Sequence, residues 1–479
     1  MPVQMPDINL VTMLPEILIA ILGLVLLLMS AGQDAERGRK VNAMALAGVI
    51  AAAALTVVTA NGSSFGGFFV VDPFARAMKL LMLLATGMVL YMSMEYMRDQ
   101  KFDGGEYQVM TLMALLGGMI MASAGDFVVL YMGLELMSLS IYVLAAWRRD
   151  DVRSNEAGLK YFVLGSMASG FLLYGISLIY GTTGTTLFTG VATALSHGHI
   201  STATIMGVVM VLAGMSFKVA AAPFHMWAPD VYEGAPTSVT AFMAVLPKIA
   251  AFAAIFRVLL IAFPALQSHW NPLLQLLAVA SLAVGAIAAI GQTNIKRMLA
   301  YSSIGHVGFI LLGLTAHTGL GYQSVVAYLA IYIFMSVGAF AIILLLNKAG
   351  VGDEIEDYKG LGHKRPMLAL LMALFMFSMA GIPPLAGFMG KLYVFMAAVQ
   401  SGMMMLAVAG VLFSAIGAFY YLRIVKFMYF DQPAEGAFGM ELDFSARAIL
   451  TVTGVVMLVW GLFPGALLSW SGASVKMFQ

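Results

Sequence analysis

The chain is a succession of apolar runs, each about as long as a helix needs to cross a membrane, separated by short polar loops. A membrane-spanning helix takes about 20 apolar residues, because the hydrocarbon core of a bilayer is about 30 Å thick. Runs of this length predict an all-α polytopic membrane protein that contacts the lipid bilayer directly. About fourteen spans are expected, at residues 9–30, 41–61, 74–96, 107–123, 127–147, 157–180, 202–229, 237–264, 273–291, 298–315, 325–347, 366–398, 402–430 and 446–468.

The composition agrees with this fold class and excludes several kinds of function. The chain is 61% hydrophobic and 10% charged, whereas soluble domains are about 25% charged. A net charge of +1 gives no reason to expect a nucleic-acid partner. Cysteine is absent, which excludes thiolate-bound iron–sulfur clusters and disulfides. We therefore expect no redox cofactor in this chain.

The basic residues are confined to alternate loops. The loops "NGSSFGGFFVVD" and "GTTGTTLFTGVATALSHGHIST" contain neither Lys nor Arg. By the positive-inside rule, the basic loops face the cytoplasm and both chain termini lie on the outer side. The basic loops and helix ends hold Arg37, Arg39, Lys40, Arg98, Lys101, Arg148, Arg149, Arg153, Lys296, Arg297, Lys348, Lys359, Lys364, Arg365 and Arg447.

Two of the predicted spans are interrupted by proline. The seventh contains "FKVAAAPFHMWAP" and the twelfth contains "MAGIPPLAGFMGK". The two spans are five apart. A five-helix unit that is repeated once is inserted the second time with inverted orientation. Paired breaks at matching positions of such repeats indicate a transport site near the membrane midplane. The predicted divisions are 1–106 (spans 1–3), 107–264 (first repeat, spans 4–8), 265–430 (second, inverted repeat, spans 9–13) and 431–479 (loop and span 14).

Four ionisable residues lie well inside apolar spans: Glu135, Lys218, Lys248 and Lys391. Each charge near the bilayer centre costs about 2.5–3.5 kcal/mol on insertion scales. Burial favours the neutral form of a lysine, whereas an opposite charge nearby favours the ammonium. A Glu–Lys pair that opens and closes can therefore take up and release a proton. A break beside Lys218 should give its ammonium access to water and to freed backbone carbonyl groups.

Other basic residues in the spans lie nearer to predicted helix ends. Their charged groups can reach the interface by extending along the helix, which is the structural alternative to a functional role. This interpretation fits Lys160, Lys79, Arg257, Arg423 and Lys426.

Two histidines fall inside or beside the spans. His306 lies in "AYSSIGHVGFILLG", and His225 follows the first break. Histidine titrates near neutral pH and could carry protons between lysines. The alternative for each is a hydrogen-bonded packing residue, and the sequence does not decide between the two.

Three motifs carry a resemblance to a known family. "FKVAAAPFHMWAPDVYEGAP", "KRMLAYSSIGHVGF" and "GIPPLAGFMGKLYVF" resemble the antiporter-like membrane subunits of respiratory complex I. These are related to the large proteins of multisubunit cation/proton antiporters. The resemblance covers spans 4–13. It implies that Glu135 and Lys218 form a proton-input pair, that Lys248 is a central relay, and that Lys391 is the connecting or output site. Lys160 matches a lysine found in one type of these subunits.

The resemblance also implies partners, location and activity. The chain would be a proton-translocating subunit, without redox chemistry of its own, of an NADH–quinone oxidoreductase in the bacterial inner (cytoplasmic) membrane. NADH, FMN, iron–sulfur clusters and quinone would be bound by partner subunits, and the neighbours would include sibling antiporter-like subunits. The chain lacks a long C-terminal lateral helix and has Lys391 where one sibling type tends to have glutamate.

Three other functions remain open on the sequence. The first is a subunit of a multisubunit Na⁺/H⁺ antiporter, and the second is a subunit of a membrane-bound hydrogenase. A Na⁺ site would need several oxygen ligands, yet Glu135 is the one carboxylate deep in the membrane beside lysines. The third is a structural spacer, which the paired breaks and buried lysines argue against.

Overall fold

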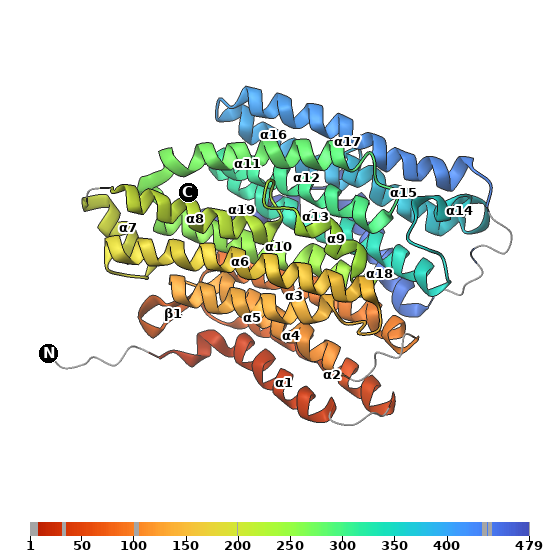
Figure 1. Ribbon diagram of the computed structural model, residues 1–479, viewed down its shortest axis with the longest axis horizontal. Coiled ribbons are helices and arrows are strands. Elements are labelled where there is room, and N and C mark those ends of the chain that lie inside the picture. The colour runs from red at the N-terminus through yellow and green to blue at the C-terminus, as the bar shows by residue number, and fades with distance from the viewer. Residues whose placement is uncertain are drawn as a thin grey trace.

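The computed structural model describes residues 8–30, 35–99, 105–198, 200–433, 438 and 443–478. Lys101 and most of the predicted loop at 431–445 lie outside these residues. The described chain is a bundle of long helices with one two-stranded antiparallel hairpin, which confirms the all-α class (Figure 1). The hairpin strands are β1 (Gly62–Ser64) and β2 (Phe69–Val71).

The helices keep the order that the apolar runs predict. They are α1 (Leu14–Ser30), α2 (Ala35–Val58), α3 (Pro73–Asp99), α4 (Glu106–Ser123), α5 (Phe127–Ala145), α6 (Val152–Thr183), α7 (Phe188–His197), α8 (Thr202–Val219), α9 (Trp227–Gly234), α10 (Thr237–Arg257), α11 (Gln267–Ala288), α12 (Ile295–Thr315), α13 (Gly319–Lys348), α14 (Leu361–Lys364), α15 (Pro366–Ala380), α16 (Ala386–Gln400), α17 (Met404–Phe430), α18 (Phe444–Leu462) and α19 (Gly465–Val475).

In the described part of the chain, 12 helices are long and apolar enough to cross a membrane. The two remaining predicted spans correspond to α4 and to the interrupted pair α15–α16. Polar side chains set the start of some helices. Asp126 accepts hydrogen bonds from the first backbone N–H groups of α5, and Asn294 does the same for α12, which satisfies donors that have no partner within a helix.

Both predicted helix breaks are present. The seventh predicted span ends earlier than expected, because α8 stops at Val219 and Ala220 adopts a left-handed conformation with φ 59°. The chain then turns before α9 begins at Trp227. In the twelfth span, α15 ends at Ala380, Gly381 has φ 87°, and α16 begins at Ala386. Each interruption is a full break between two helices rather than a bend.

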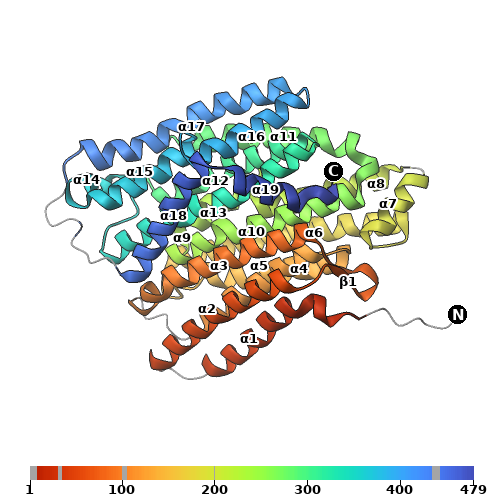
Figure 2. The same cartoon turned by 180° about the vertical axis from the view of Figure 1, so that it is seen from behind.

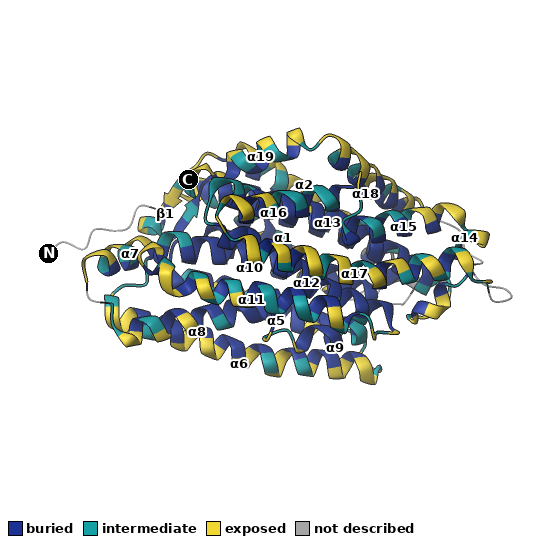
Figure 3. Cartoon of the chain, turned by 90° about the horizontal axis from the view of Figure 1, so that it is seen from above, coloured by how far each residue is buried: buried dark blue, intermediate teal, exposed yellow. Residues whose placement is uncertain are grey.

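Helix α13 forms the centre of the bundle. It contacts α3, α10, α12, α15, α16, α18 and α19, and its apolar stretch is entirely buried. The outer helices α6 and α17 carry many exposed residues (Figure 3). Polar groups on α10 and α12 lie among residues that are almost all buried.

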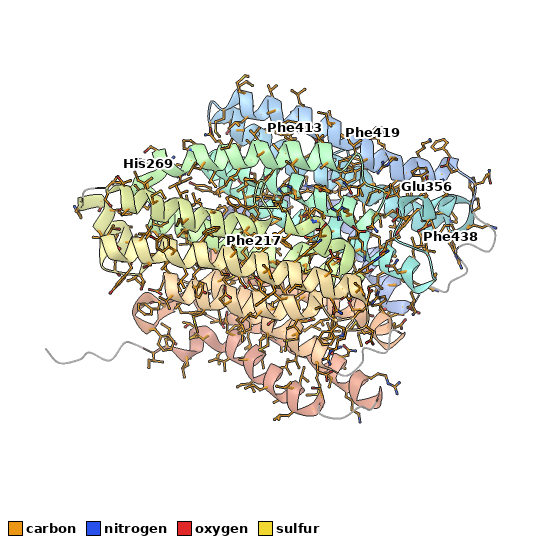
Figure 4. All side chains as sticks on the ribbon, viewed as in Figure 1. Phe217, His269, Glu356, Phe413, Phe419 and Phe438 are labelled. Carbon is orange, nitrogen blue, oxygen red and sulfur yellow. The ribbon has the colours of Figure 1, made fainter. Side chains whose placement is uncertain are left out.

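The two ends of the bundle differ. α7 and the β1–β2 hairpin lie at one end and α14 lies at the opposite end, and both views agree on this placement (Figures 1 and 2). In Figure 4, the labelled residues Phe217 and Phe413 lie midway between His269 near one end and Glu356 near the other. Phe217 on α8 and Phe413 on α17 therefore lie away from both ends of the bundle.

Candidate functional site

Lys218 is held by hydroxyl groups of α5. Its side chain is 3% exposed, and its Nζ donates hydrogen bonds to Ser138 Oγ at 2.8 Å and to Tyr142 Oη at 3.1 Å. The expectation that carbonyl groups of the break would bind this ammonium is wrong. The carbonyl of Phe217 accepts instead from the indole N–H of Trp227, at 2.9 Å, so another donor satisfies it.

Glu135 lies on α5 and faces α6. It is half-buried, and its Oε1 accepts a hydrogen bond from Ser169 Oγ on α6 at 2.5 Å. Glu135 and Lys218, the expected pair, are not in direct contact in the described structure. Ser138 and Tyr142, which follow Glu135 on the same helix, are the groups that bind the ammonium.

Lys248 is buried in α10 and is bound by the helix that follows the first break. Its Nζ donates to Tyr232 Oη on α9 at 2.7 Å, and the lysine is 2% exposed. The break therefore positions two lysines: Lys218 lies in the last turn of α8 before it, and α9 after it presents the hydroxyl group that binds Lys248.

His306 on α12 is hydrogen bonded at both ring nitrogens. Its Nδ1 lies 2.8 Å from Tyr328 Oη of α13 and its Nε2 lies 3.2 Å from Tyr421 Oη of α17. The Tyr421 hydroxyl also forms a short hydrogen bond with Ser302. In neutral imidazole one nitrogen donates and the other accepts, so one tyrosine accepts from the ring while the other donates to it.

Lys391 lies on α16 just after the second break. Its Nζ donates to the carbonyl oxygen of Ala380 at 2.8 Å and to Ser414 Oγ at 2.8 Å. At Lys391 the helix break supplies a backbone carbonyl to the ammonium, which is the arrangement that was expected for Lys218. A cavity of about 20 Å³ lies between Lys391, His306 and Tyr421, and about 10–15 Å³ suffices for one water molecule.

Lys160 lies apart from these groups, at a charged cavity between α6, α9 and α12. Its Nζ forms ion pairs with Glu156 and Asp230, both at 2.7 Å. Arg297 binds the other oxygen of Asp230 at 2.6 Å and Glu233 at 3.0 Å. Burial acts to raise the pKa of Asp230, but the hydrogen bonds from Lys160 and Arg297 hold that pKa below its ordinary value. Lys160 is therefore a paired residue rather than one that simply extends to the interface.

His225 lies in the turn between α8 and α9. It is half-buried, its ring centroid lies 6.5 Å from that of Tyr301, and its Nδ1 is a buried atom without a hydrogen-bond partner in the described structure. Among the described residues no contact joins His225 to Lys218, Lys248 or Lys391.

The interfacial interpretation of Lys79 and Arg257 is wrong. Lys79 is 1% exposed and forms an ion pair with Glu16 at 2.6 Å, linking α3 to α1. Arg257 is equally buried and pairs with Asp72 at 2.7 Å. Glu16 and Asp72 were missed because each lies near a predicted helix end. The signal that could have found them is an acid near the start of one helix together with a base at a similar depth in another helix.

No group of three or more His, Cys, Asp or Glu side chains that could hold a metal ion occurs in the described part of the chain. The site consists instead of lysines, one histidine, one glutamate and the hydroxyl groups that bind them.

Comparisons with known proteins give a consistent result. Residues 124–417 match the family model of the transmembrane region of NADH:quinone oxidoreductases and Mrp antiporters. The chain is 58% identical to NADH-quinone oxidoreductase subunit N of Magnetococcus marinus, over 99% of each chain. It is 49% identical to the subunit of the same name from Paramagnetospirillum magneticum, over 98% of each chain.

Solved structures share the fold. A chain of respiratory complex I from Thermus thermophilus, determined with bound aureothin, superimposes with a TM-score of 0.81 at 34% identity, covering 95% of this chain and 98% of that one. A chain of the Mrp complex from a Dietzia species gives a TM-score of 0.85 at 21% identity, covering 98% and 97%. At that identity the second similarity shows the fold alone.

Proposed function

Since the chain belongs to the subunit N family of NADH-quinone oxidoreductases and is thus a non-redox, antiporter-like membrane subunit of a proton-translocating complex, we propose that protons pass through it along a line of buried side chains. The line runs through Glu135, Lys218, Lys248, His306 and Lys391. Within the described residues, Lys160, at the charged cavity, and His225, in the turn of the first break, are not in contact with this line, and we propose that they serve proton uptake.

One observation carries the proposal: the three lysines of the proposed line are bound by uncharged oxygens. Lys218, Lys248 and Lys391 donate to hydroxyl groups or to a backbone carbonyl, and in the described structure none of them contacts a carboxylate. A hydroxyl group can accept from an ammonium and donate to a neutral amine. The protein therefore accommodates both protonation states of Lys218 and Lys248, as a relay requires.

Lys79 shows the opposite design within the same chain. Its ammonium is held directly by the carboxylate of Glu16, and an opposite charge at contact distance favours the ionised form of both groups. A buried lysine that only stabilises the structure is thus paired with an acid, whereas the lysines of the proposed line are not.

The proposal is tested with Lys218→Ala in the assembled complex. NADH-driven proton pumping in membrane vesicles should fall sharply while the subunit composition of the purified complex is unchanged. Lys218→Arg should not restore pumping, because arginine keeps its proton near neutral pH. Lys426→Ala, at an exposed lysine of α17, is the matched control and should pump normally. Full pumping by the Lys218→Ala complex would contradict the relay.

We also propose that residues 107–264 and 265–430 are inverted repeats. Their support is one broken helix with one buried lysine in each unit. The lysines differ in position, since Lys218 precedes its break and Lys391 follows its break. The order of helices would correspond between the two units, whereas the positions of the two lysines relative to the helix breaks would not.

The proposed location is the bacterial inner membrane, with both termini on the outer side and other membrane-arm subunits as neighbours. The basic loops and the opposite end that holds the β1–β2 hairpin support this orientation. Because the chain has no cysteine, single Ser63→Cys and Lys359→Cys variants can be labelled from either side. A membrane-impermeant maleimide added outside should label the first and not the second.

Redox cofactors would be held by partner subunits. NADH, FMN, iron–sulfur clusters and quinone are assigned to those subunits. For the clusters, the support is that this chain has no cysteine to ligate them. Purification of the intact complex, followed by separation of this chain, should leave flavin and iron with the other subunits.

A further inference from the structure

We propose that Tyr421 carries the proton between His306 and Lys391, and that Tyr328 fixes the imidazole and delivers the proton that reaches it. The inference deepens the proposed proton line and rests on it. It adds two tyrosines that no sequence motif singled out, one on each side of the imidazole.

The imidazole of His306 is held between two hydroxyl groups from different helices. Tyr328 of α13 contacts Nδ1 and Tyr421 of α17 contacts Nε2. His306, Tyr328 and Tyr421 are each no more than 3% exposed. A ring bonded at both nitrogens cannot rotate freely, so its two nitrogens point along fixed directions. One of them is aimed at Tyr421.

Tyr421 in turn faces the cavity beside Lys391. His306, Tyr421, Lys391 and Ser414 all line this cavity, and Ser414 Oγ is bonded to the lysine Nζ. The volume of about 20 Å³ admits one water molecule, which needs about 10–15 Å³ and two to four polar partners. Tyr421 and Lys391 therefore border the same space, which is large enough for a water molecule.

The Tyr421 hydroxyl has a fixed position. Its oxygen is bonded to Ser302 as well as to His306, and its ring packs on that of Tyr420 with centroids 4.3 Å apart. A hydroxyl group both donates and accepts, so it can pass a proton on without carrying a net charge. Its location between an imidazole and a water site suits that task.

The transfer balances without any further reactant. His306 starts with a proton on Nε2 and a lone pair on Nδ1. A proton from the Lys248 side of the proposed line enters through the Tyr328 hydroxyl, which gives its own proton to Nδ1 and takes up the incoming one. The Nε2 proton moves to Tyr421 Oη while the Tyr421 proton moves to the cavity water. That water gives a proton to the neutral amine of Lys391, which becomes an ammonium. Tyrosine and water end as they began, and the imidazole ends in its other tautomer.

The test compares three tyrosine-to-phenylalanine variants in the assembled complex. Tyr421→Phe should lower proton pumping about tenfold or more, since positioned proton transfer contributes factors of this size or larger. Tyr328→Phe should lower pumping and shift its pH profile, because the imidazole loses the bond that sets its tautomer. The matched control is Tyr332→Phe: Tyr332 is on the same helix as Tyr328 with its ring centroid 5.3 Å from that of His306. Its pumping should be unchanged.

A second variant covers the case in which Tyr421→Phe does not assemble. Ser302→Ala removes one oxygen that holds the Tyr421 hydroxyl and keeps both rings in place. Its pumping should fall and its solvent deuterium isotope effect should rise. If Ser302→Ala or Tyr421→Phe pumps within about twofold of the control, the inference is overturned.

Comparison with Lys391→Ala separates this inference from the proposed function. If Lys391→Ala abolishes pumping and Tyr421→Phe does not, the proton line stands and the tyrosine step falls. If neither variant lowers pumping, the proton line falls and the tyrosine step falls with it. Loss in both variants, with a normal control, supports the two together.

Discussion

Lys391 reaches back across its own helix break and donates a hydrogen bond to the carbonyl oxygen of Ala380, at 2.8 Å. Ala380 is the last residue of α15, and its carbonyl has no partner within that helix because the chain stops being helical there. The break thus supplies an acceptor to the lysine. The second hydrogen bond of this amine, to Ser414 Oγ of α17, ties it to another helix.

This geometry predicts the behaviour of Lys391 variants. Lys391→Ala removes the proton-accepting amine and should abolish most NADH-driven pumping with the complex intact. Lys391→Arg keeps the charge and its bond to the Ala380 carbonyl, yet it should also fail, because a guanidinium does not release its proton. Proton uptake by reconstituted complex is the measurement. Restored pumping in the arginine variant would show that a fixed charge is all the site needs.

Gly381 provides a test of the break itself. It has φ 87°, and a Cβ added there would lie 2.8 Å from Lys391 Cδ. Gly381→Ala should therefore strain the backbone, by about 1–2 kcal/mol, and also displace the lysine. Pumping should fall along with the unfolding temperature.

Gly402→Ala is the matched control for that change. Gly402 has φ 75° and open space around the added Cβ, so it carries the backbone strain without touching a lysine. It should lose similar stability in thermal unfolding and keep its pumping. Equal losses of pumping in both variants would attribute the effect to strain alone.

Glu135 is predicted to act through its charge. Glu135→Gln keeps an oxygen that can accept from Ser169 but removes the carboxylate charge, which favours the ammonium form of Lys218. Pumping should fall, whereas Glu135→Asp should retain part of it. Ser169→Ala shows what the hydrogen bond alone contributes. Identical pumping rates for the Gln and Asp variants would mean that charge at this position is irrelevant.

The sequence predicted most of the fold and the lysines of the site, because a lysine in an apolar run is costly wherever its helix packs. It did not reveal what binds each amine. Tyr232 and Ser414 are ordinary membrane-helix residues, and their contacts with Lys248 and Lys391 depend on how separate helices pack. For the same reason, the sequence could not predict that Glu135 and Lys218 are not in direct contact.

The pair of Glu16 and Lys79 is predicted to stabilise the attachment of α1. Breaking a buried pair by removing one partner costs about 3–5 kcal/mol, since the remaining charge is left buried and uncompensated. Glu16→Gln or Lys79→Met should each lower the thermal stability of the complex. The double variant should be closer to the parent, because no uncompensated charge remains. Additive losses in the double variant would contradict this account of the pair.

The central position of α13 has a consequence for how the chain is assembled in the membrane. Of the candidate spans, α13 is the most apolar by mean hydropathy and also the most completely enclosed by protein. A helix of this kind enters the bilayer easily as a single span, and it must later exchange every lipid contact for a protein contact. That exchange gains nothing from the hydrophobic effect, because lipid tails are as apolar as leucine. Close packing has to drive it, with small residues such as Ser324, Ala330 and Gly338 on α13 letting its neighbours approach. Membrane insertion and final packing therefore make separate demands on this one helix, and only the second depends on its shape.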